Sequence, residues 1–515
     1  MKKLKIKEYN AAYDLIKRNI LNNADKIAFI DNNIQISYKK LNDKVQKFSN
    51  SILELNLKKN DRVILCMHDS IYYPISFLGC IWAGIIPICI NTMLPEKDYQ
   101  YMLEDSEAKA VISSNSIIKT FINLDKKLKL NILFISEHEF AKNINSITSM
   151  ISSKNNIKLE PAKTYENDVC FWLYSSGSTG SPKGTLHIHK NLIATANTYA
   201  KNVIRINSND ICFSAAKLFF AYGLGNALTF PMSVGATSVL NLDRPTPELV
   251  SQIIQKYRVT IFFGVPTLYA AMLNSDSKLN NYSSLRLSVS AGEALPPHLC
   301  KKWYNSLGTK VLDGIGSTEM LHIFISNTIE DTTPGTSGKI VPGYEARVVN
   351  DNGLLADDDE IGELEIKGPS SAIAYWNKPD KSKVTFKDSW TKTGDKYIKN
   401  KEGIFTYCGR VDDMMKVSGQ YVSPFEVEAS LQTHESVLEA AVVACKDKDD
   451  LIKPKAFIIL NSNYTASKEL ELSLNNHVKS QLTPFKYPRW YKFVKELPKT
   501  ATGKIQRYKL RDNNE

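Results

Sequence analysis

The segment from Tyr174 to Gly184 reads Tyr-Ser-Ser-Gly-Ser-Thr-Gly-Ser-Pro-Lys-Gly, directly after the strand-like run Val169 to Leu173. Glycines let backbone N–H groups approach phosphate oxygens, hydroxyls add donors, and a lysine adds a point charge. The segment is not a Walker A loop, which ends in Gly-Lys-Ser/Thr. A Gly/Ser-rich surface turn is the alternative that composition alone favours. As a polyphosphate-binding loop, it would use Ser175, Ser176, Gly177, Ser178, Thr179, Gly180 and Lys183.

Three further polar segments could serve the same chemistry. The glycine-rich turn from Asp313 to Glu319 ends in a carboxylate that could hold Mg²⁺ against nucleotide phosphates. Farther along, Asp395 could bind a ribose diol, and Arg410 could bind a phosphate or a ribose hydroxyl. Near the C-terminus, Pro498-Lys-Thr-Ala-Thr-Gly-Lys504 presents one lysine on a short polar loop. Together these segments predict a nucleotide site.

In this order and at this spacing, the segments resemble the acyl-adenylate-forming (AMP-binding) superfamily of acyl-CoA synthetases, luciferases and peptide-synthetase adenylation domains. The resemblance runs from about Tyr9 to Arg507. Within the superfamily, Ser214 to Asn226 and Gly314 to Phe324 are similar to the benzoate-CoA ligase and 4-hydroxybenzoate-CoA ligase family. The resemblance implies a small aromatic carboxylic acid as substrate, ATP and CoA as co-substrates, and Mg²⁺ as cofactor.

The resemblance also implies roles for individual residues. Of the expected catalytic residues, Lys504 would bridge the carboxylate and the α-phosphate, Glu319 would bind Mg²⁺, and Thr318 would contact the α-phosphate. Asp395 would contact the ribose hydroxyls, and Arg410 the ribose or a phosphate. The residues expected to border the adenine are Ala291, Gly292, Glu293, Asp313, Gly314 and Ile315.

The positions that surround the aromatic acid in the family correspond to Ala221, Tyr222, Gly316, His322 and Ile323. The small residues among them suit a planar ring better than a long acyl chain. However, His322 has apolar neighbours and Tyr222 follows two phenylalanines, so both are also typical of ordinary core residues. Which of the two would recognise a ring hydroxyl stays open.

The second half-reaction requires a thiol to reach the acyl-adenylate. In the family, the small C-terminal domain rotates about a hinge aspartate, here Asp412, and presents another face to the site. That face would carry Lys416, Ser418 and Gly419, with Gly419 where pantetheine passes close to the backbone. Because CoA brings its own thiol, no enzyme nucleophile is expected.

Short apolar runs alternate with amphipathic stretches, which predicts α/β layers with largely parallel sheets. The expected strands include Arg62 to Cys66, Ala110 to Ser113, Ile132 to Ile135 and Thr260 to Phe263, and the expected helices include Asn42 to Glu54 and Pro247 to Lys256. After Arg410 the units are shorter, with strands at Glu439 to Cys445 and Lys455 to Leu460 around a helix at Pro424 to Gln432. We therefore expect a large multi-sheet α/β domain over residues 1–411 and a small mobile α+β domain over residues 412–515.

An uncharged stretch from Ser70 to Pro95 is long enough to cross a bilayer, but Pro74 and Gly84 interrupt it. We predict instead a helix capped by Asp69 and ending at Gly84, followed by a buried strand at Ile85 to Ile90. The first residues are charged throughout and lack the apolar core of a signal peptide. The expected location is the cytoplasm, without a membrane span.

The chain of 515 residues is 43% apolar and 23% charged, which suits a large core divided over more than one domain. Its formal net charge of +11 is spread along the sequence and forms no basic block, so no nucleic-acid partner is expected. The eight cysteines lack CxxC or paired metal-ligand spacing and indicate reduced core thiols.

Three other functions fit parts of the pattern. A ligase for another small carboxylic acid would share the ATP segments and differ only in the pocket. A stand-alone adenylation enzyme would load a carrier protein in trans, since no carrier domain follows before Glu515. A non-catalytic nucleotide-binding protein would not need Lys504, Glu319 and Arg410 together. A homodimer is compatible with the resemblance, but no sequence feature demands one.

Overall fold

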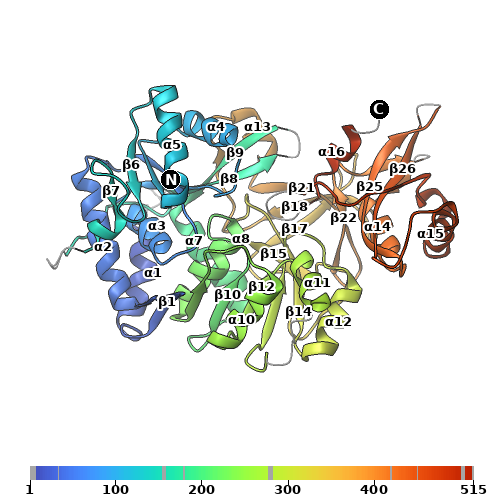
Figure 1. The fold of residues 1–515 in the computed structure, drawn as a ribbon, viewed down its shortest axis with the longest axis horizontal. Helices are drawn as coiled ribbons and strands as arrows, with labels where there is room; N and C mark the ends of the chain where they lie inside the picture. The colour runs from blue at the N-terminus through green and yellow to red at the C-terminus, as the bar shows by residue number, and fades with distance from the viewer. Residues whose placement is uncertain are drawn as a thin grey trace, which may run out of the picture. The chain divides into compact units, whose positions relative to one another are not determined.

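The computed structural model describes residues 7–32, 34–152, 158–177, 180–275, 282–417, 420–448, 451–499 and 505–512, with the backbone alone for residues 176, 177, 180, 484 and 512. The chain divides into two compact units, each of mixed helices and strands (Figure 1). The larger comprises the chain up to Glu345 with Ile366–Thr391, and the smaller comprises Ala346–Glu365 with the chain from Lys392 onward. The predicted fold class is confirmed. The predicted hinge at Asp412 concerns motion and stays a prediction.

One sheet of the larger unit has the strand order β16-β15-β14-β13-β12-β10-β11-β1-β2. Its central strands pair in parallel, and its ends pair antiparallel. The bounds are β1 Ile27–Asp31, β2 Ile34–Ser37, β10 Ile211–Ser214, β11 Thr237–Leu240, β12 Ile261–Gly264, β13 Leu287–Ser290, β14 Val311–Gly316, β15 Ile323–Ser326 and β16 Lys339–Ile340. Several predicted site residues follow the carboxyl ends of β10, β13 and β14, which is where ligands bind to open α/β sheets.

A second sheet of the larger unit has the order β19-β9-β8-β4-β3-β5-β6-β7. Its bounds are β3 Arg62–Cys66, β4 Ile86–Cys89, β5 Ala110–Ser113, β6 Leu133–Ser136, β7 Asn145–Ser146, β8 Val169–Gly177, β9 Gly180–Ile188 and β19 Ala374–Tyr375. The strands β3 and β5 have the bounds predicted from sequence, because short apolar runs bounded by polar residues are typical of buried parallel strands. The strands β6 and β12 each begin one residue later than predicted.

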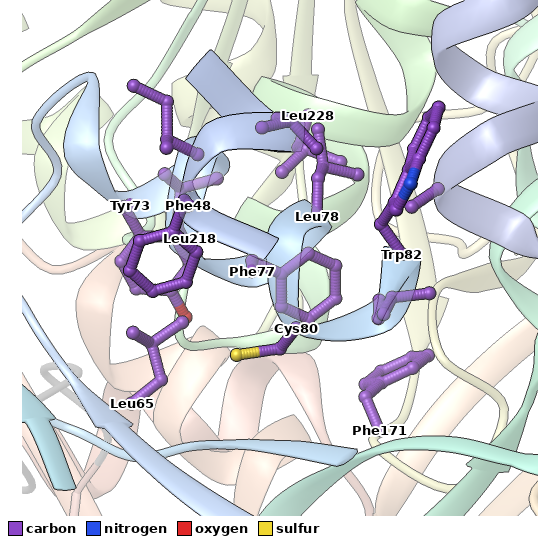
Figure 2. Packing of buried hydrophobic residues seen from close by; sticks show 14 of the residues in the cluster. Phe48, Leu65, Tyr73, Phe77, Leu78, Cys80, Trp82, Phe171, Leu218 and Leu228 are labelled. Atoms are coloured by element: carbon purple, nitrogen blue, oxygen red, sulfur yellow. The ribbon is translucent and has the colours of Figure 1, made fainter. Parts of the chain in front are cut away.

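The helix α3 (Tyr72–Trp82) occupies the apolar stretch that could be mistaken for a membrane span. Figure 2 shows Phe77, Leu78 and Trp82 of this helix within a cluster that also contains Phe48 of α2 (Tyr38–Glu54) and Phe171 of β8. These side chains are almost fully buried, so the apolar run serves the protein core. Among the described residues, no helix combines the length and the apolar composition needed to cross a bilayer.

The predicted helix cap at Asp69 is wrong. Ile71 stands at the N-cap of α3 and provides no side-chain hydrogen bond. The Asp69 carboxylate instead accepts the backbone N–H of Leu218, with oxygens at 3.1 and 3.3 Å. Because α3 begins three residues after Asp69, the carboxylate lies too far ahead of the first turn to cap it. Asp69 therefore fixes the segment that follows β10.

The helices α10 (Pro247–Tyr257), α11 (Pro266–Asn274) and α12 (Pro297–Leu307) lie beside the first sheet (Figure 1). They bury Ile254, Tyr269 and Trp303 in one cluster with Phe213 and Phe262 of the sheet. The predicted helix from Pro247 to Lys256 is confirmed, with one further residue at its end. This packing supports the sheet edge at which the predicted aryl-acid residues lie.

A further sheet has the order β17-β18-β21-β20, with β22 paired to β21. Its bounds are β17 Glu345–Val349, β18 Gly362–Lys367, β20 Phe386–Lys387, β21 Trp390–Lys399 and β22 Phe405–Arg410. The following elements are the hairpin β23 (Met415–Val417) and β24 (Gln420–Val422), the sheet β25 (Val437–Lys446), β26 (Ile452–Leu460) and β27 (Trp490–Phe493), and the helices α14 (Pro424–Gln432), α15 (Lys468–Gln481) and α16 (Arg507–Asp512). The helix α14 has the predicted bounds, and the predicted α+β character of this region is confirmed.

A buried ion pair ties α16 to α14 in the smaller unit. The Arg507 guanidinium lies 2.7 Å from Glu428 Oε2, and Glu428 also accepts the backbone N–H of Val442 at 2.7 Å. Burial raises the pKa of the Glu428 carboxyl, while the charge and hydrogen bonds of Arg507 oppose that rise. Glu428 is only 4% exposed, so its charged carboxylate would be buried without a compensating charge if the arginine were removed.

Candidate active site

The predicted phosphate-binding segment is largely a β-hairpin. The strands β8 and β9 pair Tyr174 with Gly184 and Ser175 with Lys183, so β8 runs four residues beyond the predicted strand end at Leu173. The extension follows from the partner strand, whose ladder continues past the apolar run. The backbones of Ser176, Gly177 and Gly180 lie in these strands, while Ser178 and Thr179 lie outside the described residues.

Two tryptophans pack beneath this hairpin. The rings of Trp172 in β8 and Trp376, which follows β19, have centroids 4.7 Å apart. A Cβ added to Gly184 would lie 3.3 Å from atoms of both side chains, so this glycine allows close packing of the hairpin on the indoles. The Trp376 backbone N–H also donates to the Gly184 carbonyl at 2.7 Å. The hairpin that carries Lys183 therefore packs through Trp172 against Trp376.

Lys183 and Glu319 lie close together in the larger unit and share a contact with Tyr375 of β19. The Tyr375 hydroxyl donates to Glu319 Oε1 at 2.7 Å. Lys183 Nζ lies 3.5 Å from the same hydroxyl oxygen and 4.5 Å from the centroid of the tyrosine ring. The structure therefore brings together the predicted phosphate lysine and the predicted magnesium ligand, and it adds a tyrosine that the sequence did not indicate.

The turn after β14 is held by a buried histidine. His187 Nε2 lies 2.9 Å from the Thr318 carbonyl oxygen, and the imidazole stacks on Phe171 at 5.1 Å. Burial lowers the pKa of His187 to about 4, so the ring is neutral near neutral pH and its Nε2–H can donate to that carbonyl. The Glu319 carbonyl accepts the backbone N–H of Ala372 at 2.7 Å. These contacts fix the backbone on both sides of the Thr318–Glu319 peptide.

The donor set at Glu319 fits Mg²⁺ bound together with a nucleotide. The side chain is half-buried and offers carboxylate oxygens, the ligand type that Mg²⁺ prefers. In the described residues, no group of three or more His, Cys, Asp or Glu could hold a metal ion. Magnesium in nucleotide sites commonly uses one or two carboxylates, phosphate oxygens and water. One carboxylate beside the predicted phosphate lysine is sufficient for that mode.

The two segments predicted to border the adenine are neighbours. Because β13 and β14 pair in parallel with Ser290 opposite Asp313, the turn Ala291, Gly292 and Glu293 follows β13 beside Gly314 and Ile315 of β14. Asp313 is buried, and its Oδ2 accepts the backbone N–H of Leu295 at 3.3 Å. Burial raises the pKa of Asp313 to about 8. Near neutral pH this carboxyl is mostly protonated and can donate a hydrogen bond.

The predicted aryl-acid residues converge at one edge of the first sheet. Tyr222 lies in α8 (Ala221–Leu224), next to the half-buried Ala221, and its ring centroid lies 5.4 Å from that of His322. The Tyr222 hydroxyl lies 3.3 Å from the Gly264 carbonyl oxygen and 3.2 Å from the Val289 carbonyl oxygen, to either of which it can donate. Gly316 pairs with Ile323, and a Cβ at Gly316 would lie 2.6 Å from the His322 carbonyl oxygen.

His322 is a buried residue beside Tyr222, and among the described residues its Nδ1 has no hydrogen-bond partner. Its Nε2 lies 3.0 Å from Asn226 Oδ1. The centroid of its ring lies 5.3 Å from that of Tyr199 and 4.5 Å from that of Phe230. Burial lowers the pKa of His322 to about 3, so the imidazole is neutral. A Cβ added to Gly225, the first residue of η2 (Gly225–Thr229), would lie 2.3 Å from His322 Cδ2. The sequence did not indicate Asn226 or Gly225 as partners of this histidine.

In the smaller unit, Asp395 and Arg410 face each other across β21 and β22. Arg410 Nη1 donates to Asp395 Oδ1 and to the Thr393 carbonyl, each at 2.9 Å. Gly394 has φ +71°, and a Cβ there would lie 2.8 Å from Arg410 Nη2. Asp395 and Arg410 are therefore paired with each other, and their predicted contacts with the nucleotide stay a prediction. Gly394 turns the backbone and leaves room for the guanidinium.

Two of the predicted hinge and CoA residues, Asp412 and Lys416, have partners of their own. The Asp412 carbonyl accepts Arg511 Nη1 at 2.9 Å, and its side chain is exposed. Lys416 in β23 pairs with Asp351, with Nζ 3.0 Å from Oδ2. Asp351 also accepts Lys396 at 2.9 Å and the Tyr421 hydroxyl at 2.6 Å, and these three hydrogen bonds hold the pKa of its carboxyl well below the ordinary range. Ser418, Gly419 and Lys504 lie outside the described residues.

The chain matches known families along most of its length. Residues 16–376 match the AMP-binding enzyme family, and residues 426–504 match the AMP-binding enzyme C-terminal domain. A benzoate–CoA ligase of Thauera aromatica is 50% identical over 99% of this chain and 97% of that protein. A 4-hydroxybenzoate–CoA/benzoate–CoA ligase of Rhodopseudomonas palustris is 43% identical over 98% of this chain and 94% of that protein.

Solved structures agree with these relatives. A benzoate CoA ligase from Burkholderia xenovorans LB400 has a TM-score of 0.91 and 43% identity, covering 98% of this chain and 100% of that one. An anthranilate CoA ligase in complex with anthranoyl-AMP has a TM-score of 0.92 and 38% identity, covering 99% of this chain and 98% of that one. The β8–β9 hairpin, the Thr318–Glu319 turn and the aromatic wall formed by Tyr222 and His322 therefore lie in a member of the AMP-binding enzyme family, within its benzoate–CoA ligase branch.

Proposed function

We propose that the protein is an ATP-dependent aryl-CoA ligase, which converts benzoate or a hydroxybenzoate to its CoA thioester and releases AMP and pyrophosphate. One observation carries the assignment within this family. The chain runs from Gly316, in the wall around Tyr222 and His322, directly to Thr318 and Glu319 beside Lys183. A planar acid held against that wall would place its carboxylate next to the phosphate groups of ATP.

The first half-reaction creates a leaving group. A carboxylate oxygen attacks the α-phosphorus, a new P–O bond forms, and the bond to pyrophosphate breaks. Two anions approach each other, so catalysis depends on positioned cations and donors in a site from which water is excluded. We assign Lys183 and the hairpin to the β- and γ-phosphates, Thr318 to the α-phosphate and Lys504 to the bridge between carboxylate and phosphate. A magnesium ion at Glu319 would neutralise phosphate charge.

We assign the parts of the nucleotide to residues of each unit separately. We assign the adenine to the turn after β13 and to the strand end at Asp313, whose buried carboxyl is suited to donate near neutral pH. We assign the ribose to Asp395, which Arg410 already orients at 2.9 Å. The guanidinium restrains the rotamer of the acceptor before the sugar arrives.

The second half-reaction needs no nucleophile from the enzyme. The CoA thiol, after loss of its proton, attacks the acyl carbon, and the bond to AMP breaks. We assign the CoA face to Lys416, Ser418 and Gly419 and the hinge to Asp412, so that the small domain turns between the two steps. The exposed Asp412 side chain is compatible with a residue whose backbone dihedrals change. We place the reaction in the cytoplasm, where ATP and CoA are available, and the homodimer stays a prediction.

The decisive experiment measures CoA-dependent AMP release with benzoate, 4-hydroxybenzoate, 2-aminobenzoate, cinnamate, acetate and a medium-chain fatty acid. Turnover should concentrate on the benzoates. Dominant turnover of acetate or the fatty acid would overturn the aryl pocket. AMP release without a CoA thioester would overturn CoA as acceptor and favour a carrier protein in trans.

The two-step scheme has a separate test. Lys504→Ala should abolish ATP–pyrophosphate exchange while leaving the thioesterification of preformed benzoyl-adenylate largely intact. Lys499→Ala provides a control, because Lys499 lies in the same segment but is paired to Glu439 at 2.6 Å. It should change neither half-reaction. Equal loss of both half-reactions in the Lys504 variant would contradict separate roles for the two faces of the small domain.

A further inference from the structure

Tyr375 contacts both charged groups of the candidate phosphate site. Its hydroxyl donates to Glu319 Oε1 at 2.7 Å, and Lys183 Nζ lies 3.5 Å from the same oxygen. The ammonium also lies 4.5 Å from the ring centroid, within the range of a cation–π contact. The residue is 4% exposed, so these contacts are made in a largely desolvated place.

The position of Tyr375 is set by groups other than the two charges. Its backbone pairs with Thr185 across β19 and β9, and its N–H donates to Ser382 Oγ at 2.9 Å. The ring packs against Phe386, with centroids 5.2 Å apart. A tyrosine held by a strand and an aromatic neighbour can orient a longer, more mobile glutamate side chain.

We infer that Tyr375 is a positioning residue for ATP binding, which holds the Glu319 carboxylate and the Lys183 ammonium side by side in the orientation that Mg·ATP requires. The inference rests on the proposed assignment of Lys183 and Glu319 to ATP. Donation to Oε1 fixes the carboxylate and leaves Oε2 to bind the cation. The aromatic face attracts the ammonium without neutralising it. Without the hydroxyl, lysine and glutamate would be able to form a direct ion pair that the phosphates and the metal must first break.

The test compares wild type with Tyr375→Phe, which keeps the ring and removes only the hydroxyl. Isothermal titration calorimetry without any acid substrate should show Mg·ATP binding weakened about tenfold or more, the effect typical of a hydrogen bond to a charged group. Binding of ATP in the presence of EDTA should change less, because the carboxylate then has no metal to bind and only its competition for Lys183 weakens the phosphate contact. The melting temperature should stay close to that of wild type, since the ring packing is retained.

Two further variants separate positioning from a structural role. Tyr9→Phe removes the same kind of bond, a tyrosine hydroxyl that donates to Asp14 Oδ2 at 2.7 Å, in a part of the chain without predicted site residues. It should leave Mg·ATP binding unchanged. If Tyr375 acts through Glu319, the double variant Tyr375→Phe with Glu319→Gln should bind Mg·ATP no more weakly than Glu319→Gln alone.

Three outcomes would overturn the inference: unchanged Mg·ATP binding by Tyr375→Phe, equal losses with and without metal, or additive losses in the double variant. None of them depends on the acid substrate. If wild type binds Mg·ATP but turns over no benzoate, the proposed function fails while the role of Tyr375 is still decided. If wild type turns over benzoates and Tyr375→Phe binds Mg·ATP normally, only the inference about Tyr375 fails.

Discussion

Gly225→Ala should disturb the aromatic wall without touching the ATP residues. The added Cβ would lie 2.3 Å from His322 Cδ2, whereas ordinary contacts begin at 3.4 Å, so the imidazole must shift by about 1.1 Å, the difference of these two values. A methyl group forced into a packed core costs about 1–3 kcal/mol. Loss of the bond between His322 and Asn226 adds about 1 kcal/mol. We expect the free energy of unfolding to fall by about 2–4 kcal/mol, the sum of these contributions.

The assay combines urea unfolding with steady-state kinetics. The KM for benzoate should rise, while the KM for ATP should stay near the wild-type value, because the clash lies at the pocket wall. Gly308→Ala is the control: Gly308 has φ +70° and nothing within 4 Å of an added Cβ, so it tests backbone strain alone. It should cost about 1–2 kcal/mol and leave the benzoate KM unchanged. If Gly225→Ala had the same free energy of unfolding and the same KM for benzoate as the wild type, the wall could not be closely packed.

Three further changes test the electrostatics of the fold. Burial raises the pKa of Asp313 from 3.8 to about 8. Between these two values the folded state keeps the proton that the unfolded state has lost, so the free energy of unfolding should fall as the pH rises from about 4 to about 8. Asp313→Asn should flatten that dependence in urea unfolding, and an unchanged slope would contradict it. Arg507→Met strands the buried Glu428 carboxylate and should cost about 3–5 kcal/mol, which a second change, Glu428→Met, should largely recover in the same assay. Asp351→Asn removes the partner of the exposed Lys416 and also that of Lys396, whose side chain is 7% exposed. The free energy of unfolding should therefore fall by more than the roughly 1 kcal/mol that an exposed pair contributes. Acetylation of Lys416, followed by mass spectrometry, should become faster.

The strongest sequence predictions concerned local patterns. The helix α14 and the strands β3 and β5 were predicted with their observed bounds, because capping residues and short apolar runs act over a few residues. Asp69 shows the limit of such reasoning. Its sequence neighbours suggest a cap, but its carboxylate binds Leu218, which lies 149 residues away.

In the candidate site too, residues with a local sequence pattern were predicted, and their partners from distant parts of the chain were not. Glycines, hydroxyls and charges singled out the segment of the β8–β9 hairpin and the Thr318–Glu319 turn as site candidates, because these residue types occur there together, in the order and spacing that the family shares. Tyr375 lies 192 residues beyond Lys183 and meets it only because β19 adds to β9. His187 and Asn226 act on Thr318 and His322 from strands and helices distant in sequence. Residues that meet only through the order of the strands in a sheet show no local sequence pattern from which their contact could be predicted.

The indole pair beneath the phosphate hairpin has an optical consequence. The chain has six tryptophans, and two of them, Trp172 and Trp376, lie with centroids 4.7 Å apart directly under Gly184. Closely spaced indoles share excitation energy, and their emission responds to small changes in separation and polarity. A nucleotide that tightens the hairpin alters the packing on this pair. If the hairpin binds the phosphates as proposed above, tryptophan emission is a label-free signal with which stopped-flow experiments can follow ATP arrival and pyrophosphate departure.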